Sequence, residues 1–361
     1  MRYKKKLIIL VILFLLLTLI QYTFPYSPQL VHLYNAFIFV PVQTVRNLVL
    51  GYVPLSIGDL LYLFAGVLLL ITIGEWLYYL ATIKKHKHEL AHSFLQFIII
   101  LCSAYIWFFA GWGGNYYKQR LVSYWNLDKT GWSDTTTLVD FDKYLITKLN
   151  GYAPYYHSIT LKEVNHLSKG YYRNYTNAAT RKVGLNVKPS VFGRYMEYLG
   201  IQGYYNPFTG EAQINKHLPP FMLPFVVCHE MAHQAGIAAE DDANLLSFAL
   251  GMQVPDTVFN YSAYFNLWLY TQGRLMRIDS VKGNNLKATL NPLSISHLDT
   301  LKAIREQYRG AFSEYSMALY DSYLKLHNQK EGVRSYSNAI ISAWALDKKL
   351  RAQKERVINI P

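Results

Sequence analysis

The sequence predicts a mainly α-helical membrane protein, with three N-terminal transmembrane helices followed by an α+β domain that contains a small sheet. Two observations support this fold class. Long uncharged stretches gather in the first 114 residues, and beyond them most segments look helical, apart from a short region rich in turn residues. Runs of about 20 apolar residues are long enough to cross a bilayer.

The three spans are expected at about residues 7–24, 57–81 and 94–114. The first resembles a signal peptide, because Arg2 and three lysines precede it. However, no small-x-small cleavage site follows its long apolar run, and the next residues are Pro25, Tyr26, Ser27 and Pro28. We therefore expect an uncleaved anchor, with a cleaved signal peptide as the alternative.

Basic residues predict the orientation of the chain. "RYKKK" begins it, and "KKHKH" lies between the second and third spans, so both should be cytoplasmic. Residues 1–114 then form the membrane domain of an integral cytoplasmic membrane protein, and residues 115–361 form an extracytoplasmic domain. The segment at about 25–56 would also lie outside, either flat in the lipid interface or as a loop packed on the outer domain.

The net charge of the chain limits the classes of partner that we expect. The net charge is +13, but no nucleic-acid-binding motif is visible. We expect no nucleic-acid partner; the basic surface is either simply solvated or attracted to anionic lipid or wall polymer.

Cys102 lies in the third span, so Cys228 is the single cysteine of the outer part. A disulfide framework is excluded, and we expect Cys228 to be a small buried residue.

Proline and glycine divide the outer part into segments. Pro207 and Gly210 indicate a turn between short strands, the second of which lies in "GEAQIN" and ends near Lys216. The stretch 115–185 is expected to be helical, with breaks near 130–137 and 150–154. Further helices are expected at about 223–234, 239–252, 256–279, 294–309, 312–327 and 333–355.

The stretch "VVCHEMAHQAGIAAEDDAN", residues 226–244, contains a metal-binding pattern. His229 and His233 are four residues apart, so a helix presents both imidazoles on one face. Glu230 is offset from that face, beside the position of a metal-bound water. Three protein ligands and a water are the typical arrangement of catalytic zinc. We therefore expect one Zn²⁺ and a general base at Glu230.

A third ligand requires the chain to turn after His233. Continued helix would carry Glu240 about 10 Å further along the axis. Gly236 suits a helix end with positive φ, after which "EDDAN" opens a new helix. We expect Glu240 to be the third ligand; Asp241 and groups such as His217 are the alternatives.

Several other residues near the motif are candidates for supporting roles. Asn244, one turn beyond Glu240, is placed to hold His229 or Glu240 by a hydrogen bond. Asp242 is explained by the helix dipole alone. The lone histidines His166 and His297 are expected to be structural.

Substrate contacts are expected from the strand and from tyrosines. "GEAQIN" precedes the motif helix and could offer its edge to an extended substrate. Glu211 would then contact substrate, unless it is a solvated strand residue. Tyr261 or Tyr264 could stabilise an oxyanion, but in a chain with 31 tyrosines we favour core or interface packing for either one.

Glu-x-x-Ala-Asn, formed by Glu240, Ala243 and Asn244, resembles the Glu-x-x-Ala-Asp helix of gluzincin metallopeptidases. The resemblance implies a zincin-like domain in which Glu240 is the third zinc ligand. Gly236 resembles the glycine of the metzincin turn. Two features depart from the gluzincin pattern: the spacer after His233 is much shorter than in thermolysin-like enzymes, and Asn replaces Asp.

The whole chain resembles a bacterial membrane family, the domain-of-unknown-function 3810 family. The resemblance covers the three spans, "GYYNPFTGEAQIN", "CHEMAHQAGIAAEDDANLLSF" and the late "YLKLHNQKEGVRSY". It implies the architecture and the metal site rather than a substrate.

These features together predict a membrane-anchored zinc metallopeptidase that hydrolyses a peptide or protein substrate. A non-peptidase amide hydrolase acting on cell-wall peptides would use the same site. A non-catalytic sensor or scaffold would need the metal but not Glu230, and a metal-free helical protein is the simplest alternative. Two imidazoles and a carboxylate suit zinc, but also manganese or iron. Oligomeric state and regulation are not readable from the sequence.

Overall fold

The computed structural model describes residues 2–176, 183–310 and 335–352. It is mainly helical, with three apolar N-terminal helices and a three-stranded sheet. The chain divides into two compact units. The first comprises the residues up to Lys118 together with Asn206–Glu211, and the second comprises the remainder.

Three long helices dominate the first unit: α1 (Arg2–Thr23), α4 (Ile57–Ala81) and α5 (Ile83–Gly111). All three are long and apolar enough to cross a membrane, as the sequence predicted. The second span has the predicted bounds. The prediction of 94–114 for the third was wrong at its start, because the basic run after Ile83 is helical and not a loop, with a kink at His86.

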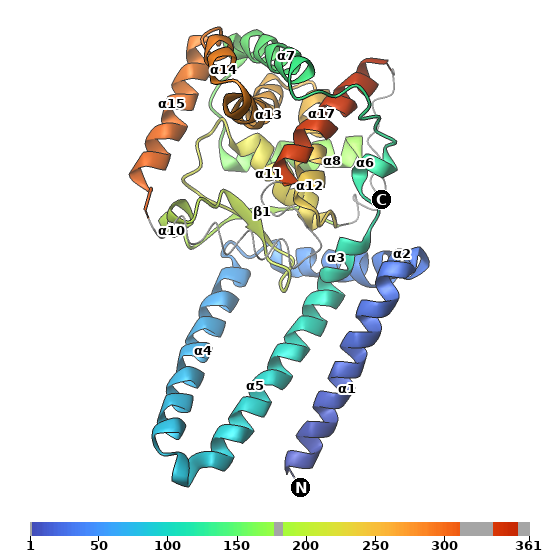
Figure 1. Cartoon of the computed structure of the whole chain (residues 1–361), viewed down its shortest axis with the longest axis vertical. Coiled ribbons are helices and arrows are strands. Elements are labelled where there is room, and N and C mark those ends of the chain that lie inside the picture. Colours follow the sequence, from blue (N-terminus) through green and yellow to red (C-terminus); the bar gives the residue numbers. More distant parts are fainter. Residues whose placement is uncertain (1, 177–182, 311–334, 353–361) are drawn as a thin grey trace. The chain divides into compact units, whose positions relative to one another are not determined.

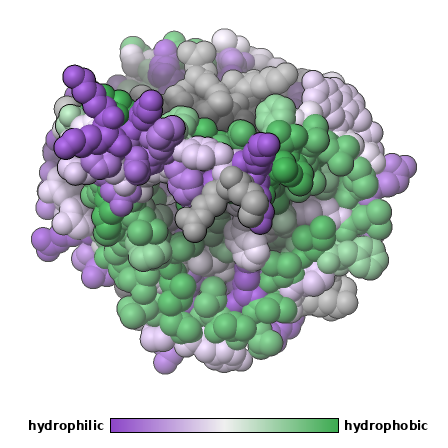
Figure 2. Space-filling model, turned by 90° about the horizontal axis from the view of Figure 1, so that it is seen from below, coloured by the Kyte–Doolittle hydropathy of each residue, from purple (hydrophilic) through white to green (hydrophobic). Residues whose placement is uncertain are grey.

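The two basic clusters lie at the same end of this unit (Figure 1). The Tyr3 hydroxyl donates a hydrogen bond to the His88 carbonyl, and Lys6 Nζ lies 3.4 Å from His92 Nδ1. Figure 2 views the molecule from this end and shows broad apolar areas beside a cluster of hydrophilic residues. The start of α1 and the start of α5 therefore share one side, which the positive-inside argument requires.

Short helices connect the first and second spans: η1 (Phe24–Tyr26), α2 (Pro28–Tyr34), the π-helical turn η2 (Asn35–Phe39) and α3 (Val40–Leu50). The Ser27 hydroxyl caps α2 by accepting a hydrogen bond from the Leu30 amide. After α5, the 3₁₀ helix η3 (Gly113–Tyr117) completes the unit.

The loop Asn206–Glu211, between two strands of the second unit, belongs to the first unit. The Glu211 carboxylate accepts hydrogen bonds from the backbone amides of Ile57, at 3.2 Å, and Gly58, at 2.6 Å. A carboxylate in this position satisfies amides that the first turn of α4 leaves unpaired. Glu211 was expected to be a solvated strand residue or a substrate contact. It is instead buried, and it caps the first turn of α4.

The second unit contains most of the predicted helices. Those expected at 223–234, 239–252, 256–279 and 294–309 correspond to α11 (Leu223–Gln234), α12 (Glu240–Gln253), α13 (Thr257–Ile278) and α15 (Pro292–Gln307). The helix expected at 312–327 lies outside the described residues, and the one expected at 333–355 is described as α17 (Ser335–Ala352).

The stretch expected to be helical at 115–185 contains α6 (Leu121–Tyr124), α7 (Thr136–Tyr152), the 3₁₀ turn η4 (Ala153–Tyr155) and α8 (Leu161–Tyr175). Two short helices were not anticipated, α10 (Arg194–Tyr198) and α14 (Ser280–Lys287).

The sheet has the order β1-β3-β2. β3 (Ala212–Ile214) pairs antiparallel with β2 (Gly203–Tyr205), through the predicted turn, and parallel with β1 (Val187–Pro189). The prediction that "GEAQIN" offers an open edge was therefore wrong. β1, which was not anticipated, occupies the second side of β3, so β3 is the central strand and β1 and β2 are the edge strands among the described strands.

Helices α11, α12 and α13 form the core of the second unit, with α7 packed on α13 and α17 on α12 (Figure 1). Large side chains on α12 and α13, such as Phe248, Phe265 and Trp268, are almost fully buried. The Asp256 carboxylate begins α13 by accepting hydrogen bonds from the amides of Val258 and Phe259. The site described below is held within this core.

Asp142, on α7, is completely buried near Trp268. Burial raises the pKa of its carboxyl from 3.8 to about 7, and the Trp268 side chain opposes this change only in part. The folded protein therefore binds this proton more tightly than the unfolded chain does. The free energy of unfolding should fall as the pH rises from about 4 to about 7, by at most about 1.4 kcal/mol for each pH unit in that range.

We predict that Asp142→Asn, which removes the buried charge, raises the melting temperature of the detergent-purified protein at pH 8 and has little effect at pH 5. Asp140→Asn is the matched control, because Asp140 lies on the same helix with its side chain 69% exposed. Equal melting temperatures for wild type and Asp142→Asn at both pH values would contradict the prediction.

Candidate metal centre

Helix α11 carries the His-Glu-x-x-His motif and ends where the sequence predicted. Pro224 stands in its first turn, where a missing amide costs little. At its C-terminus Gly236 has φ 90°. The Gly236 amide donates to the His233 carbonyl and the Ile237 amide to the Ala232 carbonyl, at 2.8 and 3.1 Å. This pair of bonds is typical of a helix end with a left-handed glycine, which turns the chain back.

His229 and His233 face each other one helical turn apart, with their Nε2 atoms 3.2 Å apart. His233 Nδ1 donates a hydrogen bond to the Ile237 carbonyl oxygen, 2.7 Å away. This bond places the proton of a neutral imidazole on Nδ1 and leaves the Nε2 lone pair directed at the shared point. The helix end that turns the chain therefore also orients a candidate ligand.

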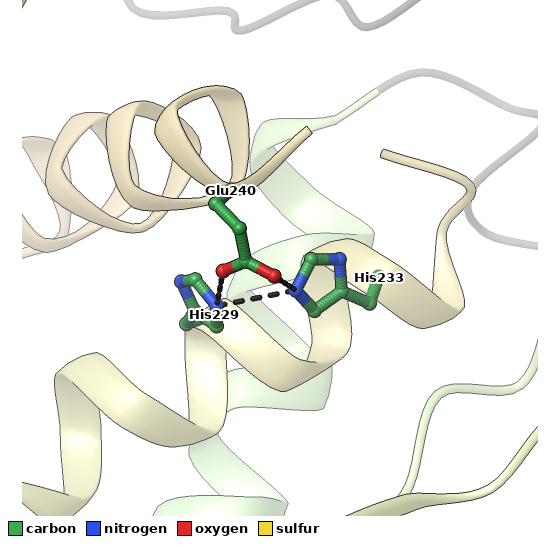
Figure 3. Close-up of side chains that lie close together, drawn as sticks. All are labelled: His229, His233 and Glu240. Atoms are coloured by element: carbon green, nitrogen blue, oxygen red, sulfur yellow. Dashed lines mark hydrogen bonds and ion pairs between the residues drawn. The ribbon is translucent and has the colours of Figure 1, made fainter. Parts of the chain in front are cut away.

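Glu240, the first residue of α12, completes the cluster (Figure 3). Its carboxylate oxygens lie 3.2 Å from His229 Nε2 and 3.6 Å from His233 Nε2. One ligand atom from each of the three residues lies within 4.8 Å of the others. Tetrahedral zinc with bonds of about 2.0–2.1 Å sets its donor atoms roughly 3.3 Å apart. The donor set therefore fits one zinc ion with little rearrangement.

Electrostatics within the cluster favour a cation. Burial would raise the pKa of Glu240, but the two imidazoles outweigh it and hold this pKa well below its usual value. Burial lowers the pKa of His233, but the Glu240 and Glu230 carboxylates outweigh it and raise this pKa to about 9. For His229 burial prevails and the pKa falls. The Glu240 carboxylate is thus ionised and draws positive charge to the site.

The other candidate ligands have other partners. Arg120 Nε donates to Asp242 at 2.6 Å, and the same guanidinium forms an ion pair with Asp241. His217 is not part of the cluster, and neither is the buried Cys228, where burial raises the thiol pKa to about 12. Among the described residues, His229, His233 and Glu240 are the only group of three that could hold a metal.

Glu230 lies beside the cluster but outside it. It is 3% exposed, and among the described residues its Oε2 has no hydrogen-bond partner. Burial raises its pKa to about 8. The backbone of Gly203, in β2, is close enough that a Cβ there would stand 2.6 Å from Glu230 Oε1. A glycine in the edge strand thus leaves room for this carboxylate.

Asn244 is positioned near His229, as the sequence suggested. It lies one turn beyond Glu240 on α12. A hydrogen bond between its side chain and His229 acts to raise the pKa of that imidazole, against the effect of burial. Asn244 also lines a small cavity bounded by α11, α12, α13 and α17. The interaction fits a role in holding the imidazole.

The two tyrosines that we proposed as oxyanion contacts are held elsewhere. The Tyr261 hydroxyl donates to Ser294 Oγ at 3.1 Å and lies 2.9 Å from His297 Nδ1. The Tyr264 hydroxyl lies 3.5 Å from that of Tyr144. Both side chains are buried in the core, in the packing role that the sequence favoured.

Tyr270, which sequence reasoning missed, interacts electrostatically with the cluster. Burial raises its pKa to about 12, and the Glu240 carboxylate adds to this rise. Tyr270 also lines the cavity next to Asn244. The spacing could have revealed it: Glu240 lies fifteen residues before Pro255 and Tyr270 fifteen residues after it. In two helices joined by a short turn, residues equally distant from the turn lie opposite each other.

We predict that the detergent-purified protein contains about one zinc per chain and that Glu240→Ala loses it. Asp241→Ala is the matched control, because its carboxylate is adjacent in sequence but paired with Arg120. It should keep the metal. Elemental analysis measures both, and loss of zinc from Asp241→Ala alone would assign the third ligand to Asp241.

A comparison with protein-family models matches residues 34–341 to a family described as "Protein of unknown function (DUF3810)". No curated protein and no solved structure matches the chain. The family match agrees with the resemblance seen in the sequence motifs and covers most of both units. The chain, with its membrane helices and its His-His-Glu cluster, therefore belongs to the DUF3810 family.

Proposed function

We propose that the protein is a membrane-anchored zinc metallopeptidase, with a zincin-like second unit outside the cytoplasmic membrane. One observation carries the proposal: the cluster of His229, His233 and Glu240, which is largely shielded from solvent, lies beside a buried Glu230 whose Oε2 has no hydrogen-bond partner among the described residues. A site that only stores or senses a cation has no need of that extra carboxylate. The orientation rests on the basic clusters, which share one end of the first unit.

Each residue of the site would have a different role in hydrolysis. His229, His233 and Glu240 would hold the ion, which when bound supplies a Lewis acid and lowers the pKa of water at its open position. Glu230 takes the proton from the attacking water and passes it to the leaving amine. Its pKa of about 8, which a neighbouring cation would lower, suits a group that both accepts and donates near neutral pH.

The oxyanion of the attacked carbonyl requires a hydrogen-bond donor. Tyr270 is a candidate, because burial and the charge of Glu240 raise its pKa and keep its hydroxyl protonated. The Tyr270 hydroxyl would stabilise the developing negative charge. Substrate would enter along β2, because this edge strand lies against Glu230 and Tyr205 packs near His233, with ring centroids 6.5 Å apart.

The first test is hydrolysis by the full-length protein in detergent with zinc. Fluorogenic peptides, unfolded protein and cross-linked wall peptides should be offered in parallel. We predict that Glu230→Gln keeps zinc but loses at least roughly 100-fold in rate, the range of general-base catalysis. Glu306→Gln makes the same chemical change at an exposed site and should keep full activity.

Cleavage confined to wall peptides would support an amide hydrolase instead of a general peptidase. A zinc-loaded protein that cleaves none of these substrates, with Glu230→Gln indistinguishable from wild type, would contradict catalysis and favour a sensor or scaffold.

We further predict that Gly203→Ala lowers the rate at least roughly tenfold while zinc content is unchanged. The new Cβ would stand 2.6 Å from Glu230 Oε1 and 2.9 Å from the Gln213 carbonyl oxygen, so the general base must move. Gly170→Ala, on α8, is the control, because nothing lies within 4 Å of its added Cβ. A wild-type rate for Gly203→Ala would show that the position of Glu230 does not limit the reaction.

Tyr270→Phe should lower kcat roughly 10- to 100-fold with zinc retained, as expected for the loss of one oxyanion donor. Tyr264→Phe, on the same helix, removes a hydroxyl that contacts Tyr144 instead and should leave kcat near wild type. If Tyr270→Phe weakens zinc binding in proportion to activity, its hydroxyl supports Glu240 and does not act on substrate.

A further inference from the structure

The segment between the first two spans is almost free of charge. From Pro28 to Leu50, across α2, η2 and α3, Arg46 is the only Lys, Arg, Asp or Glu. A helix that lies on a water-exposed surface normally turns charged residues outward and apolar residues inward. The composition of this segment leaves too few charged residues for such an arrangement.

The polar side chains of α3 point inward. Gln43 is 0% exposed; its Nε2 donates to the Gly210 carbonyl oxygen at 2.7 Å and to Asn47 Oδ1 at 3.1 Å. Arg46 Nη1 donates to the carbonyl oxygens of Gly111 and Pro207, at 3.2 and 3.3 Å. The hydrogen-bonding capacity of this helix is thus used within the first unit.

The apolar side chains of the same segment point outward. On α3 the residues Val45, Leu48 and Val49 are 59%, 62% and 62% exposed, and their spacing places them on one helical face. Leu33, in α2, and Phe37, in η2, are 48% and 74% exposed. We call these five residues the outward apolar face. Its polarity is the reverse of that found on water-soluble helices.

The segment is tied at both ends to membrane-length helices. η1 joins it to α1, and residues 51–56 join it to α4. Its inner side packs on the end of α5 by aromatic contacts: Tyr34 lies 6.2 Å from Phe109, and Phe39 lies 6.0 Å from Trp112, between ring centroids. Within the first unit, α2 and α3 run across the ends of the long helices (Figure 1).

We propose that α2, η2 and α3 lie in the plane of the membrane interface, with the outward apolar face immersed among the lipid acyl chains. The partner is the bilayer itself, because the face adjoins three membrane-length helices and carries no group that requires water. The face has no basic side chain, so the contact depends on apolar burial and not on anionic headgroups. The polar inner side meanwhile holds the loop Asn206–Glu211.

Site-directed spin labelling of the full-length protein in phosphatidylcholine vesicles tests this assignment. In a Cys102→Ala background, a nitroxide is attached at Leu48→Cys and, separately, at Leu33→Cys, two exposed positions on different helices. Leu70→Cys, 70% exposed on α4, is the acyl-chain reference, and Val281→Cys, 70% exposed on α14, is the water reference. The buried Cys228 stays in place.

The labels at Leu48 and Leu33 should resemble the one at Leu70: several-fold more accessible to oxygen, relative to a water-soluble nickel complex, than the label at Val281. A nickel preference equal to that of Val281 would place the face in water and overturn the proposal. Low accessibility to both reagents would show that protein, such as a second copy of the chain, covers the face, and would overturn it as well. Lipid contact of this face requires no catalytic activity, so either result leaves the peptidase test independent.

Discussion

The reversal of the chain between His233 and Glu240 is the constraint on which the site depends. Three donor groups must meet within 4.8 Å, although Glu240 is seven residues beyond His233. Gly236, with φ 90°, provides the reversal at a backbone conformation that other residues adopt only with strain. The same reversal sets the direction of α12, and the short turn after α12 then brings α13 back past the cluster. One glycine thereby determines both the ligand geometry and which residues of α13 lie near it.

Ion pairing determines which of three consecutive acidic residues is available to bind a cation. Asp241 and Asp242 both pair with Arg120, whose guanidinium lies at the start of α12. Burial raises the pKa of Asp242 to about 6, and Arg120 opposes this rise. Glu240 is left with the two imidazoles as partners, and its carboxylate is held ionised by them. A single arginine therefore balances the charge at this helix start and leaves one carboxylate for a cation.

Local rules predicted the parts of the site that depend on neighbouring residues. The bounds of α11 followed from Pro224 and Gly236, and the juxtaposition of His229 and His233 followed from helical periodicity. Features that depend on distant pairing were missed. β1 is three residues long and pairs in parallel with a strand more than twenty residues away, so no local pattern marks it. Glu211 looked like a strand residue because its partners, the amides of Ile57 and Gly58, are about 150 positions earlier.

The outward direction of the apolar side chains of α3 was also not predictable from neighbouring residues. A helical pattern of apolar residues predicts that one face is buried, but not whether lipid or protein buries it. The distinction comes from Gln43 and Arg46, whose acceptors Gly210 and Pro207 lie more than 160 positions later. That loop continues directly from β2, where Gly203 adjoins Glu230. Pro207 and Gly210, which hold the proposed interfacial helices, are therefore only a few positions from Gly203 in one hairpin. Gly203 leaves room for the proposed general base.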